Sequence, residues 1–137
     1  MSEKITIEAL VGAAPDLVWQ CYTQPEHITS WNFASPDWHC PSAENDLRPG
    51  GRYNARMEAK DGSFGFDLGM THDEVVPGRK LVSRMDDDRM VEVEFIPEGS
   101  DTRVRTTFDA EGQNPAEMQR QGWQAILDSF KGYVERL

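Results

Sequence analysis

The chain has 137 residues, of which 24 are acidic and 14 are basic, so its formal net charge at pH 7 is −10. This length suits one domain around one hydrophobic core. The negative charge would repel phosphate backbones and anionic lipid headgroups, so we expect no nucleic-acid or membrane partner. Two cysteines, no basic leader and no long apolar run predict a single cytoplasmic domain, residues 1–137, with reduced thiols.

The first 31 residues predict one strand and then two short helices. In "KITIEAL" apolar and polar residues alternate, which is the period of a half-buried strand. Pro15 with Asp16, and Pro25 with Glu26, each suit the first turn of a helix, because that turn leaves amide groups unpaired and favours acidic side chains. We therefore expect the two helices between about residues 14 and 31.

The middle of the chain predicts a run of antiparallel strands. Five reversals rich in Gly, Pro and Asp separate apolar–polar alternating segments; they are "RPGG" (48–51), "KDGS" (60–63), "VPGR" (76–79), "DDDR" (86–89) and "EGSD" (98–101). The alternation predicts a sheet with one apolar and one wet face. In the third of these strands it places Phe64, Phe66, Leu68 and Met70 on the apolar face.

The last 24 residues predict a long amphipathic helix. Asn114, Pro115 and Glu117 suit an N-cap, a first helical position and a capping-box acid. Apolar or small residues then recur at spacings of three or four, at Met118, Gly122, Ile126, Phe130, Tyr133 and Leu137. Packing this helix over the apolar face of the sheet gives an α+β domain.

Four separated segments, "ITIEALVGAAPDLVWQCYTQPEHITSW", "DLRPGGRY", "EVVPGRKL" and the "GW" of 122–123, make the chain resemble a known family. The resemblance is to the Activator of Hsp90 ATPase homologue 1-like family, within the START/Bet v 1-like (SRPBCC) superfamily, and it covers essentially the whole chain. It implies a helix-grip fold, in which a curved antiparallel sheet surrounds the long C-terminal helix and two short helices follow strand one. It also implies a cavity that in the superfamily often holds a lipid or another apolar molecule.

The segment "WNFASPDWHCP" (31–41) concentrates aromatic residues where that fold has its cavity mouth. Many family members carry a second tryptophan after the first, where this chain has Asn32, so a shared ligand is not implied. We expect an apolar small-molecule ligand to contact Trp31, Phe33, Trp38, His39, Tyr53, Met57, Phe66, Trp123 and Ile126. A filled core built from the same aromatic residues is an equal alternative.

Catalysis is the second hypothesis. His39 and Cys40 adjoin as in a nucleophilic pair, but neighbours in an extended segment point to opposite faces, so we expect no such dyad. The enzyme alternative is a cyclase or dehydratase type that uses the same cavity with His39 as its acid–base group. The histidines are too scattered for a metal spacing, so we expect no metal, no cofactor and no defined catalytic residue.

A protein-interaction module is the third hypothesis, either as an Hsp90 co-chaperone or as a weak homodimer. The eukaryotic activators of this family carry an additional N-terminal domain that binds the chaperone. Here the first strand is expected to begin by about Lys4, which leaves no room for that domain. We therefore favour binding of an apolar small molecule over Hsp90 activation.

Overall fold

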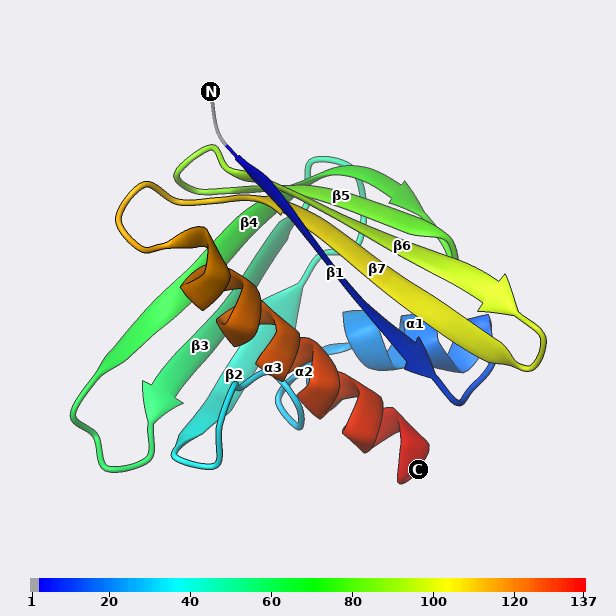
Figure 1. Cartoon of the computed structure of the whole chain (residues 1–137), viewed down its shortest axis with the longest axis horizontal. Coiled ribbons are helices and arrows are strands. Elements are labelled where there is room, and N and C mark those ends of the chain that lie inside the picture. The colour runs from blue at the N-terminus through cyan, green and yellow to red at the C-terminus, as the bar shows by residue number, and fades with distance from the viewer. Residues whose placement is uncertain (1–2) are drawn as a thin grey trace.

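The computed structural model describes residues 3–137, which form seven strands and three helices (Figure 1). All strands belong to one antiparallel sheet with the order β1-β7-β6-β5-β4-β3-β2. The elements are β1 (Lys4–Val11), α1 (Pro15–Thr23), α2 (Pro25–Ile28), β2 (Trp38–Asn45), β3 (Arg52–Ala59), β4 (Gly65–Val76), β5 (Lys80–Met85), β6 (Met90–Glu98), β7 (Asp101–Asp109) and α3 (Ala116–Glu135).

The sheet is strongly curved, and α3 lies across its inner face (Figure 1). The expected helix-grip fold, with two short helices after strand one, is confirmed. Each of the five expected reversals joins two consecutive strands of the sheet. Within residues 3–137, no helix combines the length and the apolar character needed to cross a membrane.

Alternation along the strands separates the two faces of the sheet. In β1, Ile5, Ile7 and Val11 are buried, while Thr6 and Glu8 between them are exposed. The same period repeats through β7, so the apolar faces of the strands form one core under α3.

Phe64 and Phe66 are more exposed than their predicted place on the apolar face implies. The Phe64 side chain is 61% exposed, because β4 begins one residue later at Gly65 and Phe64 lies in the preceding turn. Phe66 is 42% exposed and pairs with Met57 next to the turn that connects β3 and β4.

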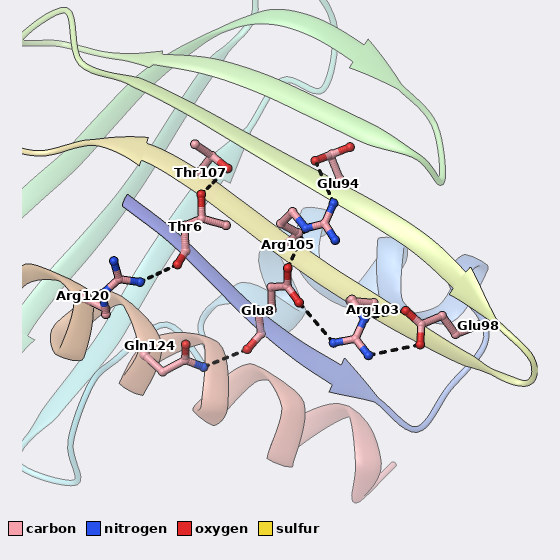
Figure 2. Close-up of polar contacts among 9 residues, drawn as sticks. All are labelled: Thr6, Glu8, Glu94, Glu98, Arg103, Arg105, Thr107, Arg120 and Gln124. Atoms are coloured by element: carbon pink, nitrogen blue, oxygen red, sulfur yellow. Dashed lines mark hydrogen bonds and ion pairs between the residues drawn. The ribbon is translucent and has the colours of Figure 1, made fainter. Parts of the chain in front are cut away.

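Charged side chains on the outer face form a ladder across β1, β7 and β6 (Figure 2). The Glu8 carboxylate accepts hydrogen bonds from Arg103, at 3.2 Å, and from Arg105, at 2.7 Å. Arg103 also binds Glu98, and Arg105 lies 3.9 Å from Glu94. The hydrogen bond from Arg105, and then that from Arg103, holds the pKa of Glu8 below its usual value. The ladder is solvated, so it contributes little to stability.

Two side chains of α3 bond to the free edge of the sheet at β1 (Figure 2). Arg120 donates to the carbonyl oxygen of Thr6 at 2.6 Å, and Gln124 donates to that of Glu8 at 3.2 Å. An unpaired strand edge is a template for pairing with another chain. The helix therefore covers part of this edge as well as the inner face.

The start of α3 differs from the expected capping box. The helix begins at Ala116, and no side chain caps it, so Asn114 is not the N-cap. Gln119 stabilises the preceding loop instead, because its Nε2 donates to the carbonyl oxygens of Asn114, at 2.7 Å, and Glu111, at 3.1 Å. Its Oε1 accepts from the Glu111 amide at 2.8 Å. A glutamine one turn inside the helix thus fixes the preceding loop, while the first helical amides have no side-chain cap.

The buried stripe of α3 is narrower than the predicted one. Leu127, Phe130 and Val134 are buried, whereas Met118 and Leu137 are 59% and 64% exposed. The buried apolar residues all lie in the C-terminal half of the helix, and the apolar residues at the two ends of the predicted stripe lie in solvent.

Candidate ligand-binding site

A cavity of about 350 Å³ lies between the sheet and α3. Its wall takes side chains from every strand except β2, from α1 and α3, and from the loop after α2. The volume falls at the lower end of the range typical of small-molecule pockets, about 300–1,000 Å³. The inner face of this domain is therefore hollow, and the alternative of a completely filled core is wrong.

Six of the nine predicted contact residues lie on the cavity wall, namely Trp31, Tyr53, Met57, Phe66, Trp123 and Ile126. They come from the loop after α2, from β3 and β4, and from the middle of α3. The Trp123 ring stacks on Phe108, with a centroid distance of 3.9 Å and an angle of 9° between the ring planes. This stacking fixes the ring of Trp123 in the helix-facing wall.

The prediction that Phe33, Trp38 and His39 line the cavity is wrong, because none of them lies on its wall. The His39 side chain is 42% exposed, and its Nε2 lies 3.6 Å from Glu58. Cys40 is buried, so the expected opposite orientation of these two neighbours is confirmed. Their alternation in β2 places the imidazole outside, and the acid–base hypothesis loses its candidate group.

Trp38 belongs to a cluster of three aromatic rings at the end of the sheet. Its ring centroid lies 6.0 Å from that of Phe64 and 6.1 Å from that of Phe66. Since Phe66 also lines the cavity, it connects the wall to this exposed cluster.

Several residues of the cavity wall were not among the predicted contacts. Ile7, Leu68 and Met70 lie on apolar strand faces, so the alternation that predicted the sheet also contained the signal for them. Strand alternation could not identify Tyr22 and Asn32. Whether these side chains reach the cavity depends on how α1 and the loop after α2 pack in the folded domain.

Polar groups of the wall gather around Tyr22 and Tyr53. The Asn32 amide donates from Nδ2 to the Tyr53 hydroxyl at 3.3 Å. The Tyr22 ring stacks on Trp31, with centroids 5.2 Å apart and an interplanar angle of 29°. The open part of Tyr22 faces the cavity, and burial raises the pKa of this phenol to about 12. Burial also raises the pKa of Tyr53, and the neighbouring Tyr22 and Cys40 add to this effect. Both hydroxyls therefore stay protonated at neutral pH.

A smaller cavity of about 40 Å³ shares Tyr22 and Tyr53 with the larger one and is also lined by His72. The His72 side chain is buried, with Nδ1 2.9 Å from the Ser83 hydroxyl and Nε2 2.6 Å from the Asn45 amide oxygen. Burial lowers the pKa of His72, and the opposing effect of Asp46 is smaller. The imidazole is thus a neutral, hydrogen-bonded wall group.

Backbone pairing holds His72 in this position. Its amide donates to the Gly51 carbonyl at 2.9 Å, and its carbonyl accepts from the Gly50 amide at 2.7 Å. Gly50 has a φ of 83°, which favours glycine, and a Cβ on Gly51 would collide with the Asp46 carbonyl oxygen. The "RPGG" turn therefore attaches the β2–β3 loop to β4 beside the cavity.

The charged part of the wall comes from loops. Arg89 follows β5, and Glu111 lies between β7 and α3. The Arg89 Nε binds the Asp87 carboxylate at 2.7 Å, while a Glu111 carboxylate oxygen accepts from the Asn114 amide at 2.6 Å. Both charges are thus engaged by their own loops. Over residues 3–137, no three His, Cys, Asp or Glu side chains are grouped so that they could hold a metal ion.

A curved seven-stranded sheet that surrounds a long helix and an internal cavity defines a domain of the helix-grip, SRPBCC/Bet v 1-like class. The family model described as "Activator of Hsp90 ATPase homolog 1-like protein" matches residues 12–135. The chain belongs to this family, which confirms the resemblance found in the sequence.

Solved structures agree with this assignment. The chain is similar to an AHSA1-like protein from Aeromonas hydrophila, with 45% identity over 98% of this chain and 93% of that one, and a TM-score of 0.93. A protein from Cytophaga hutchinsonii has 45% identity over 97% and 92% of the two chains, with a TM-score of 0.84. A Chromobacterium violaceum protein, 23% identical over 97% and 98%, shares the fold with a TM-score of 0.85. No curated protein matches the chain.

Proposed function

We propose that the protein binds a hydrophobic or aromatic small molecule in the cavity between the sheet and α3. The observation that carries this proposal is the 350 Å³ cavity with its mostly apolar wall. Met57, Met70 and Met85 contribute flexible thioethers that adapt to the shape of a ligand, and Trp31 and Trp123 contribute flat rings. Filling such a space would bury apolar surface that the folded chain leaves accessible.

We propose that the protein binds this molecule without changing it chemically. A cyclase or dehydratase would need a titrating group in contact with the bound molecule. His39 is on the outer face, and His72 lines only the smaller cavity, where Ser83 and Asn45 engage both of its ring nitrogens.

The test is an NMR titration of the labelled protein with a panel of apolar and aromatic compounds. We expect shifts at Met57 on β3 and at Trp123 and Ile126 on α3, which lie on the cavity wall. The variant Leu68→Trp fills the cavity from β4 and should lose binding. Its matched control, Leu10→Trp, changes a 38% exposed residue of β1 and should keep it. Equal binding by both variants, or no shift with any compound, would contradict the proposal.

A second candidate function, weak self-association, is favoured by the exposed aromatic cluster of Trp38, Phe64 and Phe66. Exposed apolar patches often mark protein contacts. Sedimentation at increasing concentration should then show a dimer that Phe64→Ser weakens. The control Met118→Ser removes another exposed apolar side chain, at the start of α3, and should leave the dimer intact. A monomer at all concentrations would eliminate this candidate.

A further inference from the structure

The cavity contains polar groups that have no protein partner. Within residues 3–137, every fully buried side-chain nitrogen or oxygen has a hydrogen bond. In that part of the chain, the hydroxyls of Tyr22 and Thr106 have no hydrogen-bond partner, and both residues line the cavity. Their hydroxyls are therefore reached from the cavity, where a bound molecule could pair with them.

The Asn32 amide offers a further polar atom at the same place. Asn32 is only 4% exposed, and its Nδ2 is used by the Tyr53 hydroxyl. The amide oxygen has no partner in the described part of the chain. If the amide were reversed, its nitrogen would take that position, so either orientation leaves one polar atom for a ligand. The Tyr53 hydroxyl accepts from Asn32 and keeps its own proton available.

The groups around this position are uncharged. Tyr22 and Tyr53 remain protonated, and Asn32 and Thr106 cannot ionise. The charged wall residues, Arg89 and Glu111, are bound by their own loops. A carboxylate or an ammonium group placed beside Tyr22 would lose its hydration without gaining an opposite charge, which is costly. A neutral hydroxyl or carbonyl would find both donors and acceptors.

The rest of the wall favours a flat ring system. Thioethers of Met57, Met70 and Met85 and the rings of Trp31 and Trp123 surround the space, and sulfur and aromatic groups both pack well against aromatic rings. We propose that the cavity selects an uncharged aromatic molecule bearing a hydroxyl or carbonyl group, which the Tyr22 hydroxyl binds together with Asn32, Tyr53 and Thr106. This inference rests on the proposed function and names its class of ligand.

Three probes of one ring system test this proposal: naphthalene, 2-naphthol and 2-naphthoate at pH 7. NMR titration of the wild-type chain should show 2-naphthol binding about fivefold more tightly than naphthalene, the effect of one net hydrogen bond. The anion 2-naphthoate should bind more weakly than naphthalene. In Tyr22→Phe the preference for 2-naphthol should disappear while naphthalene affinity is unchanged. Thr106→Val should reduce the preference in the same direction.

Tyr133→Phe is the matched control, because the Tyr133 hydroxyl lies 2.6 Å from His27 Nδ1 and is not part of the cavity wall. It should keep the full preference. Equal affinities for naphthalene and 2-naphthol in the wild type, or a preference that survives in Tyr22→Phe, would overturn the ligand class but leave cavity binding intact. If none of the three probes binds, the proposed function itself fails.

Discussion

The two halves of α3 pack against the same sheet in different ways. Toward its C-terminus, Phe130 and Val134 are buried, and the Phe130 ring makes edge contacts with Trp31 at 4.9 Å and Tyr22 at 5.2 Å. Toward the N-terminus, Trp123 and Ile126 are only partly buried and face the cavity. α1 lies against the filled half, where Tyr22 also contacts Phe95.

This difference shows how one helix can serve stability and binding at once. Interlocked aromatic rings at the filled half hold the helix on the sheet, and Trp31 is fixed further by its indole N–H, which donates to the Cys21 carbonyl at 2.8 Å. The half of α3 that borders the cavity is then held in place by the packing of the filled half rather than by close packing of its own. We expect substitutions in the filled half to affect mainly stability, and substitutions in the hollow half to affect mainly ligand binding.

The largest expected effect is the loss of stability in Phe130→Ala. Removing this fully buried ring should lower the free energy of unfolding by about 3–5 kcal/mol. Ile126→Ala, on the cavity wall, should cost about 2 kcal/mol or less, because part of that side chain has no protein neighbour. Urea denaturation of both variants measures the difference. Equal losses would mean that the two halves of α3 are packed alike.

The next effect concerns the buried His72 beside the smaller cavity. The pKa of His72 is lower in the folded chain than in the unfolded chain, where it is about 6.5. At pH values between these two pKa values, the unfolded chain binds more protons than the folded chain. The unfolding free energy should therefore fall as pH decreases below about 6.5, and each tenfold difference in proton affinity corresponds to about 1.4 kcal/mol. His72→Gln should remove this slope, while His39→Gln on the outer face should retain it. An unchanged slope in His72→Gln would show that His72 does not titrate in this way.

The smallest effect is expected on the outer face, where the cavity is not involved. Arg105→Gln removes one partner of the solvated Glu8 ladder and should change the unfolding free energy by little more than the experimental error. Its inward neighbour in β7 is Thr106, so Arg105→Gln also serves as an outer-face comparison for the Thr106→Val binding experiment. A large loss of stability, or altered binding of 2-naphthol, would contradict the separation between the two faces.

Strand alternation and turn residues were sufficient to predict the sheet, because each depends on the local chain. They also placed Ile7, Leu68 and Met70 on the inner face, where they now line the cavity. The contacts of segment 31–41 were predicted less well. Trp31 lines the cavity, but Trp38 packs beyond the end of the cavity and the His39 side chain points outward. Their direction depends on where β2 begins, which residue types alone do not determine.

Of the polar residues of the cavity, Tyr53 was among the predicted contacts, whereas Tyr22, Asn32 and Thr106 were not. Tyr22 is one of several apolar or aromatic residues on α1, and only the packing of this helix against Phe95 and Trp31 directs its ring to the cavity. Asn32 stood out only as a departure from the pattern of the family that the sequence resembles. Its burial against Tyr53 follows from the tertiary arrangement of the loop after α2 and β3.

The most direct test of the hollow half as a binding site is to locate a bound probe. Intermolecular NOEs from 2-naphthol to the protein methyl groups provide this location. We predict NOEs to the methyls of Met57, Met70 and Ile126, which surround the cavity from β3, β4 and α3. NOEs confined to the partly buried ring of Trp38 and the exposed ring of Phe64, with none to these methyls, would show binding outside the cavity and contradict the account.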